Sequence, residues 1–253
     1  EAEETLIDGL DKNQLVEIDD ETMRLQEATN TLEKAGDRYA RKTITDRALP
    51  DVRDGLIPVQ RAIIYAMKEM GLNANAKHKK NAQSVGRVSG DYHPHGTSSI
   101  YGAQVNLSQW FKNNVTLVEF QGNNGSIDGD GAAAERYTES RLTRMGEEMM
   151  ATVKQDTVDM TPNYSNTTTQ PVVAPAEWPV LFTNGHLGIA YGYACNFALH
   201  NPYELLEAAI YVNKNENARL STIRKYVKGP DFPTGGIVYG QDGINDMYET
   251  GKG

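Results

Sequence analysis

The turn HPHG at residues 93–96 separates two helical segments, and this arrangement constrains the fold of the chain more than any other feature. The basic segment KHKKNAQSVGRVSGDY precedes the turn. An apolar stripe at helical spacing follows it, with Ile100, Ala103, Leu107 and Trp110. Two helices joined by a tight turn form a helix-turn-helix unit, an arrangement that many DNA-binding proteins use. The alternative is a packed helix pair with a solvated lysine face, and the spacing leaves both open.

The segments on either side of this helix pair predict a mixed α+β domain. Pro58 suits the first turn of a preceding helix, and Gly71 is its predicted end. The stretch NVTLVEF at 114–120 alternates like a strand, and QGNNGSIDGDG at 121–131 is a glycine-rich loop, so the two predict a β-wing beside the helices. Apolar residues at helical spacing predict a further helix through 142–153.

Composition limits the class of protein. The 253 residues carry a net charge of −9, and no apolar run approaches the ~20 residues that span a bilayer, so a membrane partner is not expected. Cys195 is the single cysteine; we expect a small buried residue in a reduced, cytoplasmic protein. The acidic balance argues against nucleic acid unless the basic residues form a local patch. Eight acids lie within residues 1–20, where we expect an arm that is poorly ordered or docked on a partner.

The pair Arg136–Tyr137, within GDGAAAERYTESRLTRMG, is the candidate for covalent chemistry. A phenol is a weak nucleophile at neutral pH, but adjacent guanidinium groups favour its anion and neutralise a phosphate under attack. The arrangement therefore suits attack on a phosphodiester. The alternative is a packed tyrosine with ordinary surface arginines, and nothing in the residues alone separates Tyr137 from Tyr92 or Tyr101.

Other motifs match no complete site. The loop at 121–131 has neither the GxGxxG nor the P-loop pattern, so a small-molecule phosphotransferase is only a further alternative. Asp128 and Asp130 are expected to be solvated turn acids, and no metal site is expected in this chain. His93 and His95 lack a completing metal-ligand cluster, and we expect them to donate hydrogen bonds within the turn or to a phosphate.

Six longer motifs occur in order: RALPDVRDGL, VSGDYHPHG, QGNNGSIDGD, AAAERYTESRL, NGHLGIAYGYA and GPDFPTGGI. From about Thr45 onward the chain resembles the A-type breakage–reunion subunits of bacterial type IIA topoisomerases, which are found in DNA gyrase and in topoisomerase IV. The resemblance implies an N-terminal fragment of an α+β protein. A mostly helical winged-helix DNA-gate domain over 46–160 would precede the start of an α/β tower domain over 161–253. Apolar spacing predicts one more helix, over 21–45.

The stretch AAAERYTE resembles the family's AAAxRYTE, whose tyrosine attacks a DNA backbone phosphate. The resemblance implies that Tyr137 forms a transient 5′-phosphotyrosyl link, that Arg136 stabilises the pentavalent phosphate, and that a second duplex passes through the gap. A B-type partner would hold Mg²⁺ and ATP, and two copies of each chain would form an A2B2 assembly on double-stranded DNA. The main alternative is a non-enzymatic winged-helix DNA-binding module, which would not need Tyr137.

The resemblance also implies contacts with DNA and with drugs. The helix from Gly96 to about Phe111 matches the recognition helix, and Ile189 in GIAYG matches the isoleucine that wedges between base pairs and bends the duplex. Ser98 and the position of Gly102 match the quinolone contact site. The other residues implied in DNA binding, together with Ser98 and Ile189, are Arg47, Arg53, Arg61, Lys80, Arg87, His93 and His95.

The chain departs from the family pattern at several positions. The usual HPHGDSAVYD is HPHGTSSIYG here, so Thr97 and Gly102 replace two aspartates. A basic residue is missing near Ile57, and an RR pair has become Arg61–Ala62. These changes indicate a divergent branch, such as one carried by a phage or a mobile element. We expect the lost acid to weaken the metal–water anchor of quinolones, and DNA binding to depend steeply on salt.

Overall fold

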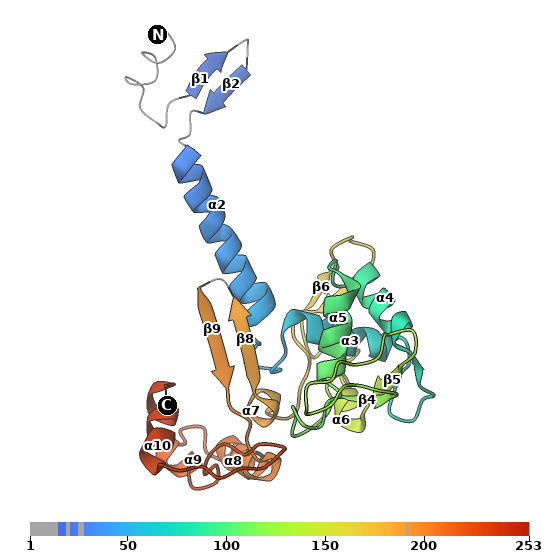
Figure 1. Cartoon of the computed structure of the whole chain (residues 1–253). Helices are drawn as coiled ribbons and strands as arrows, with labels where there is room; N and C mark the ends of the chain where they lie inside the picture. Colours follow the sequence, from blue (N-terminus) through green and yellow to red (C-terminus); the bar gives the residue numbers. More distant parts are fainter. Residues whose placement is uncertain (1–14, 19–20, 25–27, 191, 253) are drawn as a thin grey trace.

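The computed structural model is a mixed α+β fold with several small antiparallel sheets (Figure 1). It describes residues 15–18, 21–24, 28–190 and 192–252. The elements follow in chain order: β1 (Leu15–Ile18), β2 (Glu21–Arg24), α2 (Ala28–Thr43), a short π-helical turn η1 (Ile44–Ala48), α3 (Pro58–Glu69), β3 (Lys79–Lys80), α4 (Asn81–Asp91), α5 (Thr97–Asn106), β4 (Val118–Gln121), β5 (Glu139–Leu142), α6 (Arg144–Glu148), β6 (Met160–Pro162), β7 (Thr169–Pro171), α7 (Val180–Asn184), β8 (His186–Ala190), β9 (Tyr193–Phe197), α8 (Pro202–Lys214), α9 (Leu220–Ile223) and α10 (Gln241–Thr250).

The N-terminal part consists of the β1–β2 hairpin and the helix α2, which projects away from the rest of the molecule (Figure 1). The helix predicted over 21–45 begins only at Ala28, because residues 21–24 pair with β1 as a strand. The acidic arm expected over 1–20 lies outside the described residues, apart from β1.

A compact domain is built on α3, α4 and α5 around one hydrophobic core. The predicted start and end of α3 are confirmed. Pro58 occupies its first turn, and Gly71 follows it with a φ of 69°, a backbone conformation that favours glycine. Ile63 and Met67 of α3 and Ile100 of α5 are fully buried in the shared core.

A three-stranded antiparallel sheet in the order β3–β5–β4 lies beside these helices. The strand predicted over 114–120 is shorter and later than expected, at Val118–Gln121. The helix predicted through 142–153 is wrong in its first part, because Leu142 pairs with Val118 at the end of β5 and its side chain enters the core. Only the short helix α6 follows, and Thr143 caps it by accepting the N–H of Gly146.

The compact domain continues past residue 161, where a domain boundary was expected. Tyr65 of α3 donates its hydroxyl hydrogen to the carbonyl of Thr169 in β7 (3.2 Å), and Ala174 and Val180 belong to the same core.

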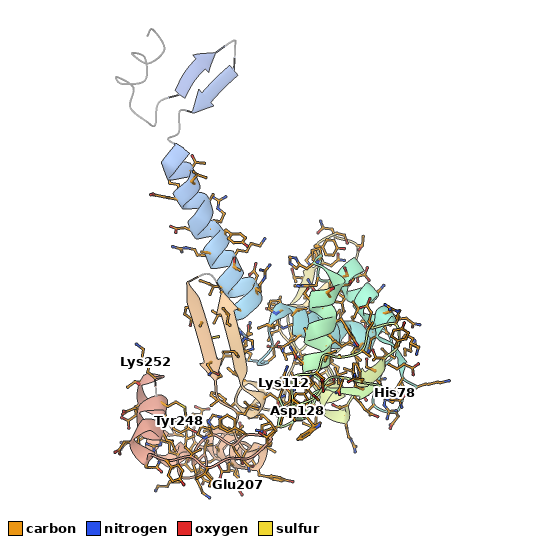
Figure 2. The ribbon with its side chains drawn as sticks, in the orientation of Figure 1. His78, Lys112, Asp128, Glu207, Tyr248 and Lys252 are labelled. Carbon is orange, nitrogen blue, oxygen red and sulfur yellow. The ribbon has the colours of Figure 1, made fainter. Side chains whose placement is uncertain are left out.

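Beyond the compact domain, the β8–β9 hairpin leads to α8, α9 and α10, which enclose a small separate core that includes Leu205 (Figure 1). Figure 2 places Tyr248 in this C-terminal group and His78 on the compact domain. Within the described residues, no helix combines the length and the apolar character needed to cross a bilayer.

Candidate active site

Tyr137 lies on the loop between β4 and β5, with 65% of its surface exposed. The central carbon of the Arg136 guanidinium lies 4.6 Å from the centroid of the Tyr137 ring, a cation–π stack that keeps the cation beside the phenol. The structure thereby separates three tyrosines that the sequence left equivalent. Tyr92 is 5% exposed in the core, and the hydroxyl of Tyr101 is bonded to the carbonyl of Ala133 (2.5 Å).

The residues around Tyr137 attach its loop to the start of α4. The N–H of Asn81 donates to the carbonyl of Thr138 (3.0 Å). Thr138 is buried, although the adjacent Tyr137 is exposed. The ammonium of Lys80 lies 3.4 Å from the carbonyl oxygen of Tyr137 and 2.9 Å from the carboxylate of Glu139. Lys80 therefore lies close to the backbone of Tyr137, and its ammonium is paired with Glu139. Asn81 and Thr138 were missed at the sequence level, since an Asn and a Thr in polar segments carry no distinctive signal.

The HPHG turn brings His93 and His95 together, with ring centroids 4.4 Å apart. Burial, together with the smaller effects of the charges on His95 and Arg47, lowers the pKa of His93 from 6.5 to about 4. His93 is therefore neutral at physiological pH, and Arg47, far away in sequence, lies close enough to affect it. Arg47 itself is exposed at the end of η1.

Helix α5 presents Ser98 and Gly102 on its exposed side. The helix ends at Asn106, earlier than the recognition helix expected to reach Phe111. A Cβ added at Gly102 would meet open space, so a larger residue fits there. A cavity of about 580 Å³ extends from Ala103 of α5 to Leu187 of the β8–β9 hairpin.

Three of the expected DNA-binding arginines, Arg53, Arg61 and Arg87, are engaged in ion pairs. The guanidinium of Arg61 is held by the buried carboxylate of Asp54 (2.5 Å) and also donates to the carbonyl of Leu56 (2.9 Å), which leaves its side chain 12% exposed. Arg53 is exposed and makes a two-point contact with Asp51, whose pKa it lowers to about 2. The ion pair with Asp54 therefore gives Arg61 a structural role. Arg53 lies at the surface, where its guanidinium can leave Asp51 and bind another anion.

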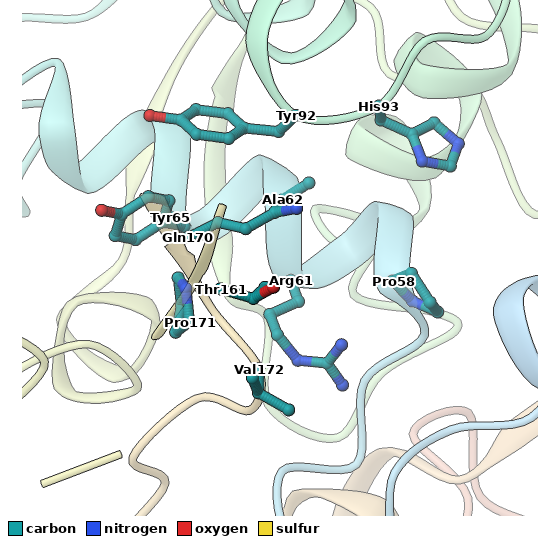
Figure 3. A pocket seen from close by; sticks show the side chains of 10 residues that line it. All are labelled: Pro58, Arg61, Ala62, Tyr65, Tyr92, His93, Thr161, Gln170, Pro171 and Val172. Atoms are coloured by element: carbon teal, nitrogen blue, oxygen red, sulfur yellow. The ribbon is translucent and has the colours of Figure 1, made fainter. Parts of the chain in front are cut away.

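Arg61 also lines a cavity of about 340 Å³ on the compact domain. Figure 3 shows it there together with Tyr65, Tyr92 and His93. Arg87, on α4, pairs with Asp91 four residues later (2.6 Å) and remains partly exposed.

Ile189 is 74% exposed on strand β8. The carbonyl oxygen of Ala48 holds the β8–β9 hairpin, since the Nε2 of His186 in β8 lies 2.8 Å from it and the buried thiol of Cys195 in β9 lies 3.8 Å from it. Gly188 allows this approach, because a Cβ there would lie 2.2 Å from the same oxygen. The burial expected for Cys195 is confirmed.

No group of three or more His, Cys, Asp or Glu side chains that could hold a metal ion occurs in the described part of the chain. Asp130 accepts the hydroxyl of Ser126 (2.7 Å), and Asp128 is exposed on the same loop. These two acids lack the third ligand that a Mg²⁺ site would take, so the described residues do not fit a resident metal.

The profile of the A-type subunits of DNA gyrase and topoisomerase IV matches residues 47–253, and the chain belongs to this family. It is 51% identical over 216 residues to the A-type chain of DNA topoisomerase 4 from Mycoplasma pneumoniae, an alignment that covers 85% of this chain and 27% of that protein. It is also 48% identical over 224 residues to the A-type chain of DNA gyrase from Helicobacter pylori, an alignment that covers 88% of this chain and 27% of that protein. The chain thus spans about a quarter of the length of these relatives.

Proposed function

We propose that this chain is the DNA cleavage–religation part of a type IIA topoisomerase and that Tyr137 is its nucleophile. The observation that carries the proposal is the exposed phenol of Tyr137 under the Arg136 guanidinium, in a chain that belongs to the A-type family of gyrase and topoisomerase IV. The helices α3 to α5 with the β3–β5–β4 sheet are proposed to be the winged-helix DNA gate, and the segment from β8 onward the start of the tower.

In the proposed reaction the phenol of Tyr137 gives its proton to water and its oxygen attacks a DNA phosphorus. The bond from phosphorus to the 3′ oxygen breaks, and that oxygen takes up a proton to become a 3′-hydroxyl. One phosphodiester replaces another, so the reverse reaction reseals the strand without ATP. Arg136 lies where its guanidinium can neutralise the pentavalent phosphate, because it is already stacked on the nucleophile.

The DNA duplex is proposed to lie across α5 and the exposed Ile189, whose side chain would enter between base pairs and bend the DNA. Contacts to the backbone would fix its register, with little direct base recognition. The backbone contacts are assigned to Arg47, Arg53, Lys80, Arg87, His93, His95 and Ser98. Arg61 is left out of this set because Asp54 holds it.

A B-type partner is proposed to supply both Mg²⁺ and the ATP site. Two copies of each chain would form an A2B2 complex in the cytoplasm, in which each Tyr137 cuts one strand. The names of the relatives support an assembly, since each describes one subunit of a larger enzyme.

The test mixes the full-length protein with its B-type partner, Mg²⁺ and supercoiled plasmid, and then adds detergent. We expect broken DNA that carries covalently attached protein. Tyr137→Phe should abolish this product and leave DNA affinity unchanged, while Tyr203→Phe, at an exposed tyrosine of α8, is the matched control with full cleavage. A wild-type protein that binds DNA but forms no covalent product would support the binding-module alternative.

A further inference from the structure

The loop that carries Tyr137 is tied to the protein interior by consecutive hydrogen bonds that the proposed reaction does not use. Asn81 donates from Nδ2 to the Oγ1 of Thr138 (2.8 Å), and the hydroxyls of Thr138 and Tyr101 lie 2.8 Å apart. Tyr101 donates to the carbonyl of Ala133 (2.5 Å). The backbone is thus held on both sides of Tyr137, while the Tyr137 ring stays exposed.

Gln104 of α5 extends this network across the domain. Its Nε2 donates to the Oδ1 of Asn81 (2.9 Å) and to the hydroxyl of Ser140 (2.7 Å), and its Oε1 lies 3.0 Å from the hydroxyl of Ser84. Asn81 and Gln104 have no exposed surface. One buried amide therefore connects α4, α5 and β5, the strand that begins two residues after Tyr137.

The energetics of this network favour a single arrangement. A buried amide is costly unless it is hydrogen-bonded, and both N–H groups and the carbonyl oxygen of Gln104 have partners. A shift of α5 relative to the Tyr137 loop would leave several of these groups unpaired at once. A buried network in which the amide oxygen and nitrogen of both Gln104 and Asn81 have partners rigidifies the elements that it joins.

We propose that Gln104 and Asn81 are positioning residues, which couple the DNA-binding helix α5 to the backbone that presents Tyr137. The inference rests on the proposed function. Both side chains are fully buried, so they act through Thr138 and Ser140 and touch neither DNA nor the phenol. Their role is to keep the phenol oxygen at the scissile phosphorus once the duplex lies on α5, since misplacement of about 1 Å can slow a reaction up to ~10²-fold.

The test uses the full-length protein with its B-type partner, Mg²⁺ and a duplex that contains one cleavage site. Gln104→Leu keeps the approximate size of the side chain and removes all its hydrogen bonds. In single-turnover experiments at saturating DNA we expect the rate constant for covalent complex formation to fall by ~10-fold or more, with DNA affinity unchanged. A merely structural role would instead lower the melting temperature and the amplitude of the reaction, and would leave the rate constant at the wild-type value.

Asn163→Ala is the matched control. Asn163 is also a buried amide of the compact domain, bonded to the carbonyl of Asp91 (2.8 Å) and the N–H of Thr167 (2.9 Å), and none of its bonds reaches the Tyr137 loop. We expect this variant to be destabilised but to cleave at the wild-type rate constant.

A second variant covers the case in which Gln104→Leu does not fold. Ser140→Ala removes a single bond of the network and should produce a smaller fall in the same rate constant. A wild-type rate constant in Ser140→Ala, or in a folded Gln104→Leu protein, would overturn the inference. Absence of the covalent complex in the wild-type protein would overturn the proposed function instead.

Discussion

The carboxylate of Asp54 holds the guanidinium of Arg61 through two charge-assisted hydrogen bonds, of 2.5 and 3.1 Å. The same carboxylate accepts the N–H groups of Leu56 (3.0 Å) and Ala174 (2.8 Å). One fully buried acid therefore joins the loop before α3, the helix itself and the segment after β7.

Arg61→Ala is expected to lower the free energy of unfolding by about 3–5 kcal/mol, because it leaves the buried charge of Asp54 uncompensated. Arg53→Ala is the control at an exposed ion pair, where little or no loss of stability is expected. Urea denaturation of both variants measures the difference. Equal losses of the free energy of unfolding in the two variants would show that the buried Asp54–Arg61 pair stabilises the fold no more than the exposed Asp51–Arg53 pair.

Gly188→Ala is expected to displace the β8–β9 hairpin from Ala48, because the new methyl group would lie 2.2 Å from a backbone oxygen. The expected loss of stability is about 1–3 kcal/mol, and the DNA bend that is proposed to depend on Ile189 should decrease. Energy transfer between the labelled ends of a duplex reports the bend. Gly243→Ala in α10 meets open space and should leave bending unchanged. An unchanged DNA bend in the Gly188→Ala protein would show that bending does not depend on the position of the β8–β9 hairpin.

The stability of the domain is expected to fall as pH decreases from about 6.5 to about 4. Burial lowers the folded-state pKa of His93 from 6.5 to about 4, so in this range the unfolded chain binds a proton that the folded chain does not. His93→Gln should reduce the slope of the free energy of unfolding against pH. Burial also lowers the pKa of His186 and of His200, so part of the slope should remain. An identical slope in His93→Gln would contradict the assignment.

Gly102→Asp is expected to increase quinolone-stabilised DNA cleavage, because it restores an acid at the position that resembles the metal–water anchor of the drug. The exposed side of α5 has room for the new side chain. Gly102→Asn is the control, because asparagine is similar in size to aspartate but uncharged. This variant should show no increase in quinolone-stabilised cleavage. The yield of covalent complex against drug concentration measures it, and equal drug response in the parent and Gly102→Asp proteins would argue against the anchor.

Local signals in the sequence were sufficient for several elements. Pro58 and Gly71 delimit α3 because their backbone preferences act within one turn, and the HPHG break sets the start of α5 for the same reason. Periodicity failed at Leu142, whose spacing suits a helix, because pairing with β4 decided the conformation there. The motif around Tyr137 named the candidate nucleophile through resemblance alone.

The sequence by itself determined the family, the order of the motifs and the short elements whose caps and turns lie close along the chain. The tertiary structure alone decided that Tyr137 is exposed while Tyr92 is buried, and that a buried acid binds Arg61 while Arg53 remains at the surface. It alone brought Gln104 to Asn81 and Ser140. The physical reason is that burial and hydrogen-bond pairing depend on partners distant in the chain, and no local pattern of residue types specifies those partners.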